Sequence, residues 1–466
     1  MGDCVPLRQG QVSKSGKRAV EIAKSLVRNS RASLPKVCSA SAAKRAYEFL
    51  ANEKVGHAGL LSGPVNRTLI ECASESTVLL VQDTTSCAFG GRKCREGLGP
   101  VNDSPKAQGM HVHTCLALTE SGRVLGVLEQ EVWARSTEKH AKDESSRERR
   151  KRERESERWA RTARVACERL QVASVGAQRI HVGDREADIF ELFTELDALG
   201  DGFVLRATYD RRTSAGANDM RTYSLSEAEA TPVIAYKPVE VPARPGQSAR
   251  TARMEIRAKR VEVMPPKAVQ RRGKPIWMNV VIVSEIEPPS AKQALRWNLL
   301  TREPIESATD VLRIAAIYAL RWTIEDFHMG LKSGCSLEQR QFETFDRLAN
   351  FLVFATAIAV HALCLRDASR ATEPRPASDV LSPIQLKLLR QSASRLSPNC
   401  DAREALRAVA ALGGFFDTSK KARPGWRTIF GGMQILLERE AGYLRALENL
   451  RQAGVDVPPE VQGSRE

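Results

Sequence analysis

Strand-like and helix-like segments alternate through the middle of this 466-residue chain, and this alternation constrains its fold more than any other feature. Three segments with β-branched residues or alternating polarity come first, at 76–83, 110–118 and 123–133. The strand-like RIHVGD, the helical EADIFELFTEL and the strand-like GFVLRATY follow them. Strands separated by helices are typical of sheets with parallel pairing, so the pattern predicts an α/β fold.

Regions of different composition flank this pattern. Between about 210 and 290, Pro/Gly turns and β-type runs predict a β-rich insertion, after which ALRWNLLT resumes the α/β pattern. Amphipathic segments predict helices at both ends of the chain. We therefore expect five regions: a helical region at 1–73, a first core part at 74–209, the insertion at 210–290, a second core part at 291–366 and a helical region at 367–466.

The charge and the cysteines narrow the class of protein. The chain has 71 Lys and Arg against 56 Asp and Glu, a formal net charge of +15, which favours a polyanionic partner such as nucleic acid. A charge-dense segment at 139–170 predicts a solvated helix rather than a dedicated DNA clamp. None of the ten Cys forms a Cys-x-x-Cys pair, so neither a zinc site nor a secreted disulfide framework is indicated, and a reduced cytoplasm fits best.

One apolar run, at 348–365, is nearly long enough to cross a membrane. It carries Asn350 and His361 and stands alone, so we interpret it as a buried core helix. The N-terminus shows no apolar signal core, and we expect neither a targeting segment nor a membrane partner. No Gly-x-x-x-x-Gly-Lys-Ser/Thr loop occurs, so the sequence shows no site for nucleotide hydrolysis.

Residues 318–332 (YALRWTIEDFHMGLK) place many polar groups on one predicted helix. Each helical residue advances roughly 100°, so Tyr318, Arg321, Glu325, His328 and Lys332 all fall within about 80° of one another. A face with several cations, a carboxylate and a phenol is more useful for holding phosphates beside a metal than for packing. A solvated helix face is the alternative.

Two further acids end strands of the predicted sheet. Asp83 ends VLLVQD and Asp184 ends RIHVGD, so both side chains should lie at the rim of the sheet, where Glu325 could join them. Three carboxylates within a few Å repel one another unless a divalent metal neutralises them. Oxygen ligands favour Mg²⁺, with Mn²⁺ as a substitute.

Four other polar residues receive structural interpretations. His111 and His113 share one face of a strand, and we interpret them as core or rim residues rather than metal ligands. Asp188 is expected to stabilise the N-terminus of a helix. Asp326 points about 100° away from its neighbour Glu325 and is expected to be solvated.

These motifs resemble those of cut-and-paste DNA transposases with a DDE catalytic triad, in the transposon-five branch of the insertion-sequence-four family. The matching stretches are QDTTS around Asp83, GDREAD around Asp184, and Tyr318-x₂-Arg321-x₃-Glu325-x₆-Lys332, the family's YREK signature. Similarity continues through AAKRAYEFLAN, WNLLTREPIES and PGWRTIFGG and so covers most of the chain. The first fifteen or so residues depart from the family's usual opening, and 431–432 are Gly-Gly where many relatives carry Trp-Arg.

The resemblance implies a fold and roles for the residues. The fold would be a ribonuclease-H-like catalytic core at 74–209 and 291–366 with a β insertion, a DNA-binding region at 1–73, and a dimerisation role for 367–466. Asp83, Asp184 and Glu325 would be catalytic residues that hold Mg²⁺ or Mn²⁺. The residues implied to contact DNA are Tyr318, Arg321 and Lys332, on a phosphate, and Trp297, on a flipped base.

The implied activity is metal-dependent cleavage of transposon ends, hairpin formation and strand transfer into target DNA. The partners would be double-stranded DNA, at terminal inverted repeats and at the target, and a second copy of the chain in the DNA complex. The expected location is the bacterial cytoplasm, at the nucleoid. Two alternatives stay open at this point: a ribonuclease-H-like nuclease that cuts without joining, and an inactive DNA-binding product of such an element.

Overall fold

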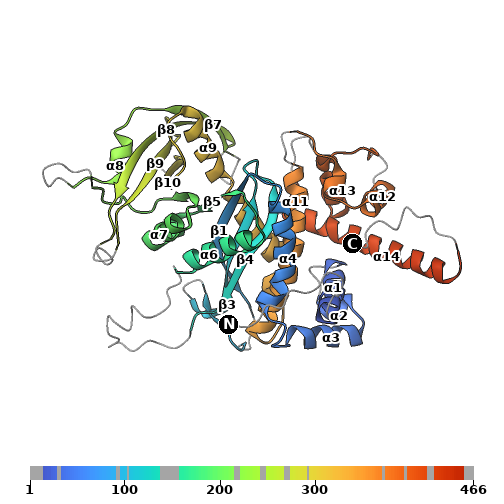
Figure 1. The fold of residues 1–466 in the computed structure, drawn as a ribbon. Helices are drawn as coiled ribbons and strands as arrows, with labels where there is room; N and C mark the ends of the chain where they lie inside the picture. The colour runs from blue at the N-terminus through green and yellow to red at the C-terminus, as the bar shows by residue number, and fades with distance from the viewer. Residues whose placement is uncertain are drawn as a thin grey trace.

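A mixed β-sheet with helices on both faces forms the centre of the computed structural model, and further helices lie to one side of it (Figure 1). The structure describes residues 14–28, 33–90, 95–101, 104–136, 157–214, 221–241, 248–266, 273–290, 293–369, 373–392, 396–416 and 424–455. In that part of the chain the sheet has ten strands in the order β2-β3-β1-β5-β6-β10-β9-β8-β7, with β4 paired to β3. The fold is therefore mixed α/β, as the sequence predicts.

The first half of the sheet combines an antiparallel meander with two parallel strands. β1 pairs antiparallel with β3, and β3 pairs antiparallel with β4, while β5 pairs parallel with β1 and β6 pairs parallel with β5. Helix α7 makes the crossover between the two parallel strands, as such pairs require. The bounds are β1 Thr77–Ala88, β2 Gly99–Val101, β3 Ser104–Leu118, β4 Val124–Trp133, β5 Gln178–Gly183, α7 Phe190–Leu199 and β6 Gly202–Arg206.

The predicted β-rich insertion at 210–290 continues this same sheet. Strand β10 pairs antiparallel with β6 on one side and with β9 on the other, so it joins the insertion strands to the core. Beyond β9 the antiparallel pairing continues to β8 and β7. The bounds are β7 Ala235–Val241, β8 Arg250–Val263, β9 Ile276–Glu285 and β10 Arg296–Thr301.

Helices cover the two faces of the sheet because β1 is apolar on both sides. Leu79 and Val81 join a large cluster with residues of α10 and α11, whereas Val78 and Leu80 join a cluster with residues of α6. Period-two alternation sends these two pairs to opposite faces. The helices concerned are α6 Glu157–Val172, α8 Ser224–Glu229, α9 Ala308–Ala319, α10 Trp322–Met329 and α11 Phe345–Ala368. The part of the charge-dense segment at 139–156 lies outside the described residues.

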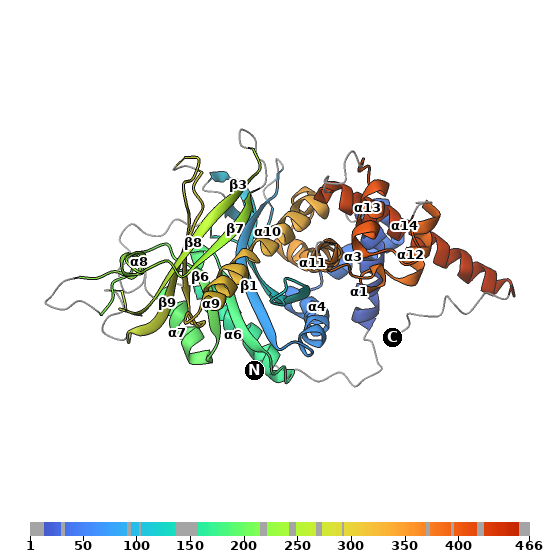
Figure 2. The ribbon, with the colours of Figure 1, turned by 90° about the horizontal axis from the view of Figure 1, so that it is seen from above.

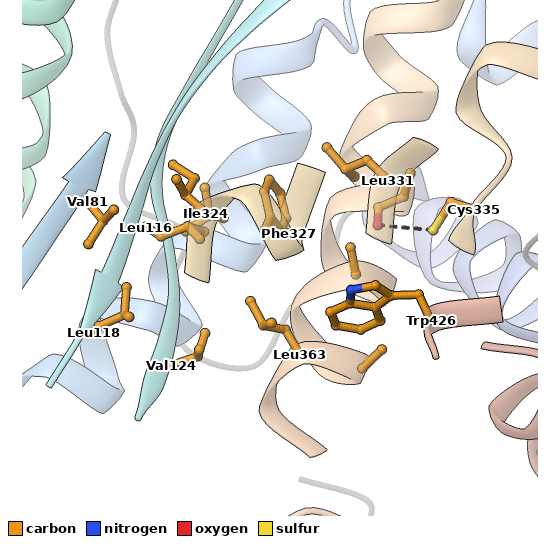
Figure 3. Close-up of a cluster of buried hydrophobic side chains, with 14 of the residues drawn as sticks. Val81, Leu116, Leu118, Val124, Ile324, Phe327, Leu331, Cys335, Leu363 and Trp426 are labelled. Carbon is orange, nitrogen blue, oxygen red and sulfur yellow. Dashed lines mark hydrogen bonds between the residues drawn. The ribbon is translucent and has the colours of Figure 1, made fainter. Parts of the chain in front are cut away.

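The apolar run at 348–365 forms the central helix of the packed core. It belongs to α11, the one helix among the described residues that is long and apolar enough to cross a membrane, and 72% of its apolar window is buried inside the protein. Figure 3 shows Ile324 and Phe327 of α10 between the strand residues Val81 and Leu116 and the α11 residue Leu363. The interpretation of this run as a core helix is confirmed.

The terminal helical regions pack beside α11, away from the insertion strands (Figure 2). Helix α14 contacts α1, α12 and α13, so the N-terminal and C-terminal helical regions pack against each other. The bounds are α1 Lys14–Arg28, α2 Leu34–Val37, α3 Ala40–Leu50, α4 His57–Cys72, α12 Pro383–Ser392, α13 Ala402–Leu412 and α14 Trp426–Gln452, with short 3₁₀ turns η1 at Arg185–Ala187, η4 at Leu337–Gln339 and η5 at Ala377–Asp379.

The single helix expected over 318–332 is interrupted, so this expectation was wrong. Helix α9 ends at Ala319, a turn covers Leu320 and Arg321, and α10 runs only to Met329. A π-helical turn, η3, then covers Gly330–Gly334. The polar residues of this stretch therefore cannot be placed by one helical wheel.

Close packing at Gly183 fixes the end of β5 just before Asp184. A Cβ at Gly183 would lie 2.6 Å from the Cβ of Ala187 and 3.0 Å from the ring of Trp159. We predict that Gly183→Ala lowers the free energy of unfolding by about 1–3 kcal/mol, because the packed neighbours must shift. Gly176→Ala is the control, since a Cβ there meets no atom within 4 Å. Urea unfolding of both variants checks this, and equal losses would contradict the packing argument.

Candidate active site

Parallel pairing of β1 with β5 brings Asp83 close to Asp184. Val81 of β1 is paired with Val182 of β5, and each aspartate follows its paired valine by two residues. The Asp184 carboxylate accepts a hydrogen bond from the Glu186 backbone N–H at 2.8 Å, which fixes the turn after β5. Asp184 directly follows β5 as expected, but Asp83 lies inside β1, which continues to Ala88 because it stays paired with β3, so the prediction that Asp83 ends its strand was wrong.

The surroundings of Asp83 disfavour its negative charge. Burial, followed by the nearby charge of Asp184, raises the pKa of Asp83 to about 7, although the Thr84 N–H and Arg321 oppose the shift. The Thr84 backbone N–H donates to Asp83 Oδ1 at 2.7 Å. A cation bound between the two carboxylates would relieve their repulsion.

Glu325 is held beside this pair by Arg321. Arg321 Nη2 donates to Glu325 Oε1 at 2.7 Å, and its positive charge also opposes part of the rise in the pKa of Asp83. The Arg321 side chain is 7% exposed and that of Glu325 is 41% exposed, so the carboxylate faces outward. In this arrangement Glu325 is linked to the aspartates through the guanidinium group.

Trp297 and Tyr318 pack against each other next to Arg321. The Trp297 and Tyr318 ring centroids are 5.5 Å apart, and Arg321 Cζ lies 5.9 Å from the Tyr318 ring centroid. Trp297 is half-buried on β10, whereas Tyr318 is buried. Within the described residues the Tyr318 hydroxyl and Arg321 Nε are buried without a hydrogen-bond partner. Both atoms can donate to a phosphate oxygen if the packing of Trp297, Tyr318 and Arg321 opens.

His328 also lies near Asp83, and Lys332 follows it on η3. His328 Nδ1 is 4.0 Å from Asp83 Oδ2. Burial, with a smaller contribution from the charge of Lys332, lowers the pKa of His328 to about 3, so its imidazole is neutral at pH 7. Lys332 is half-buried on η3. His328 therefore links Asp83 to Lys332, while the roles predicted for these residues stay predictions.

Asp188 has a different role from the expected one, and the prediction of helix N-terminal stabilisation was wrong. Helix α7 begins at Phe190, two residues further on. The buried Asp188 carboxylate accepts from the Thr208 and Tyr209 backbone N–H groups at 2.6 and 2.9 Å and from Arg211 Nε at 2.8 Å. It therefore anchors the segment that follows β6.

Asp326 is bonded to other helices rather than solvated, so that expectation was also wrong. It accepts hydrogen bonds from Arg366 of α11 and, at 3.3 Å, from Trp426 Nε1 of α14. Its side chain is only partly exposed. Asp326 thus ties α10, which carries Glu325, to the helical region behind it.

The histidines of β3 are core residues, as predicted. His111 is buried and stacks on Trp133, with ring centroids 5.3 Å apart. His113 is fully buried, and burial lowers its pKa to about 3. Both rings therefore take part in packing, and His113 also bonds to Thr84 at 2.8 Å.

A buried polar cluster that the sequence interpretation missed lies beneath the site. Among the described residues, three groups able to ligate a metal come within 4.8 Å of one another at Cys167, His181 and Asp201, and not at the acidic triad. His181 and Gln82 are polar residues at inward positions of apolar strands. That pattern is the available sequence signal, because a buried polar side chain needs a partner.

Residues 14–55, which include α1 to α3, match the model of a family described as Transposase DNA-binding. This match supports a DNA transposase with DNA as its partner. The structure is also similar to one described as the cryo-EM structure of piggyBac transposase synaptic complex with hairpin DNA, at 10% identity and a TM-score of 0.34, over 91% of this chain and 79% of that chain. A likeness at this level carries no argument about chemistry.

The raised pKa of Asp83 makes stability depend on pH. Its pKa is about 7 in the folded chain, against about 3.9 in an unfolded chain. Between these values the folded state binds more protons, so the free energy of unfolding falls as pH rises. With a chelator present to remove divalent metal ions, Asp83→Asn should raise the free energy of unfolding by roughly 2–4 kcal/mol at pH 8 and by less at pH 5. Urea unfolding at both pH values measures this, and equal gains would contradict the assignment.

Proposed function

We propose that this protein is a DDE transposase that cleaves and joins DNA at transposon ends. The observation that carries the proposal is the placement of Asp83 and Asp184 at matched positions of adjacent parallel strands, with Glu325 beside them. The family match at 14–55 supports a DNA-binding transposase independently of these residues. The mixed sheet, in which β1, β3 and β4 are antiparallel and β5 and β6 are parallel to β1, supports a ribonuclease-H-like core.

Asp83, Asp184 and Glu325 fit a divalent metal. Carboxylate oxygens are the ligands that Mg²⁺ and Mn²⁺ prefer, and the mutual repulsion at Asp83 provides the reason to bind a cation. Bound metal would supply charge stabilisation for the attacking and leaving oxygens of the phosphodiester. For Glu325 to act as a ligand, its carboxylate must turn from Arg321 toward the aspartates, which leaves the guanidinium free for a phosphate.

The chemistry consists of successive phosphodiester exchanges. Water attacks the phosphodiester at the transposon end and frees a 3′-OH, which attacks the opposite strand to form a hairpin and, after its opening, the target DNA. Each transfer exchanges one phosphodiester for another, so no nucleotide hydrolysis is needed. Tyr318, Arg321 and Lys332 would hold the adjacent phosphate, Trp297 would stack on a flipped base, and the joining of two ends implies a dimer on the DNA.

The triad is tested by Asp83→Ala, Asp184→Ala and Glu325→Ala. Each variant should lose cleavage of an end-containing duplex in Mg²⁺, by about a thousandfold or more, while DNA binding in a gel-shift is largely kept. Asp197→Ala is a matched control, since Asp197 is an exposed acid on α7 that pairs with Arg302. Substantial cleavage by any one triad variant would remove that residue from the site, and a strand-transfer assay separates a transposase from a nuclease that only cuts.

Trp297 is expected to act at hairpin formation. Base stacking on an aromatic ring contributes roughly 1–3 kcal/mol, so Trp297→Ala should slow hairpin formation about ten- to a hundredfold and first-strand nicking less. An abasic nucleotide at the flipped position should partly rescue it. Denaturing gels that resolve nicked, hairpin and cut products measure the rates, with Trp297→Phe as the control that keeps a ring. Equal slowing of both steps without abasic rescue would assign Trp297 to packing.

A further inference from the structure

A continuous chain of hydrogen bonds crosses three strands on the face of the sheet opposite Asp83. His181 Nε2 lies 2.9 Å from Asp201 Oδ2, and Gln82 Nε2 lies 3.2 Å from His181 Nδ1. His113 Nε2 is 3.1 Å from Gln82 Oε1, and Thr84 Oγ1 is 2.8 Å from His113 Nδ1. The side chains between the ends, those of His181, Gln82 and His113, are all at most 2% exposed.

The ionised end of this chain orders its donors and acceptors. Burial alone would raise the pKa of Asp201, but hydrogen bonds from His181 and Arg179 outweigh burial and hold the pKa below its usual value. A carboxylate only accepts, so His181 Nε2 donates to Asp201. With neutral imidazoles, His181 Nδ1 accepts from the Gln82 amide, Gln82 Oε1 accepts from His113 Nε2–H, and the Thr84 hydroxyl donates to His113 Nδ1. This arrangement of protons satisfies the whole chain.

The hydrogen bonds at the Asp201 end of this hydrogen-bonded chain are complete without a metal. Cys167 Sγ donates to Asp201 Oδ2 at 2.9 Å, and Arg179 Nε donates to Asp201 Oδ1 at 2.7 Å. The guanidinium of Arg179 already supplies the positive charge that the buried carboxylate needs. The Cys167, His181 and Asp201 group is therefore an anchor for the hydrogen-bonded chain.

The hydrogen-bonded chain holds the two residues that flank Asp83 on β1. Gln82 and Thr84 flank Asp83 on β1, and their side chains point to the face opposite its own. Thr84 is paired with His113 in the sheet register, and its backbone N–H orients the Asp83 carboxylate. A shift of β1 along its neighbours would break several buried hydrogen bonds at once, which is costly in a low-dielectric interior.

We propose that Gln82, His113 and His181 are positioning residues that hold Asp83 in place for metal binding. This inference rests on the function proposed above. None of the three touches the reacting atoms, and each acts through the backbone of β1. Groups of this kind behind metal ligands typically contribute ten- to a hundredfold to metal affinity.

The test measures Mn²⁺ binding to the full-length protein directly. The electron paramagnetic resonance signal of free Mn²⁺ reports how much Mn²⁺ is bound. The binding that is lost in Asp83→Ala defines the site. Gln82→Leu and His113→Phe should each weaken this binding about tenfold, and the double variant should weaken it no further than about tenfold, because the chain acts as one unit. His113→Phe keeps the edge-on ring contact with Trp159, whose centroid is 4.7 Å away.

Leu80→Val is the matched control for a purely structural effect. Leu80 is buried on the same face of β1 and is paired with His181, but it carries no polar group. It should bind Mn²⁺ like the wild type even though its melting temperature falls. Melting temperatures of all variants are measured without metal, and binding is compared well below the lowest of them.

The outcomes separate this inference from the function on which it rests. If wild type and Asp83→Ala take up Mn²⁺ equally, there is no metal site at Asp83 and the proposed function fails. If the wild-type site binds Mn²⁺ and both Gln82→Leu and His113→Phe bind it as tightly, the positioning role is overturned. It is also overturned if Leu80→Val weakens binding as much as they do.

Discussion

The parallel pairing of β1 with β5 is the interaction on which the candidate active site depends. It joins two segments about a hundred residues apart in sequence, Thr77–Val81 and Gln178–Val182, in one register. β5 ends at Gly183 while β1 continues to Ala88, so this register brings Asp184, the residue after β5, next to Asp83 inside β1. A shift by one residue would turn one of the two aspartates to the opposite face of the sheet. Gly183, which tolerates no Cβ, and the hydrogen-bonded chain through Gln82 both hold this register.

Electrostatics then decide how the site is arranged without a ligand. Burial and the repulsion between the two carboxylates raise the pKa of Asp83, and the nearby charge of Arg321 offsets part of this effect. Arg321 also binds Glu325, so one guanidinium faces acids from two parts of the chain. A divalent cation would take over that neutralising role and release Arg321 toward a phosphate. Metal binding and DNA binding would therefore favour each other at this residue.

The two faces of β1 make different kinds of contact. On one face, α10 and α11 pack against Val81, and α10 places His328 near Asp83. On the other face, polar side chains join β1 to its neighbours through directed hydrogen bonds. Apolar packing alone fixes volume and tolerates small displacements, whereas a chain with one satisfied proton arrangement does not. The combination explains how β1 can carry an energetically unfavourable carboxylate in a fixed position.

The sequence by itself indicated the strands that carry Asp83 and precede Asp184, because side-chain alternation and turn residues are local signals. That Glu325 joins these two acids stays a prediction. Only the tertiary structure decided that β1 continues past Asp83, the break at Leu320 and Arg321, the bonds of Asp326 to Arg366 and Trp426, and the role of Asp188 as an anchor for Arg211. The hydrogen-bond partners of Asp188 and Asp326 lie between 20 and 100 residues away. A periodicity argument sees only neighbours within a few residues, so it cannot show whether a polar side chain ends in solvent or against a distant helix.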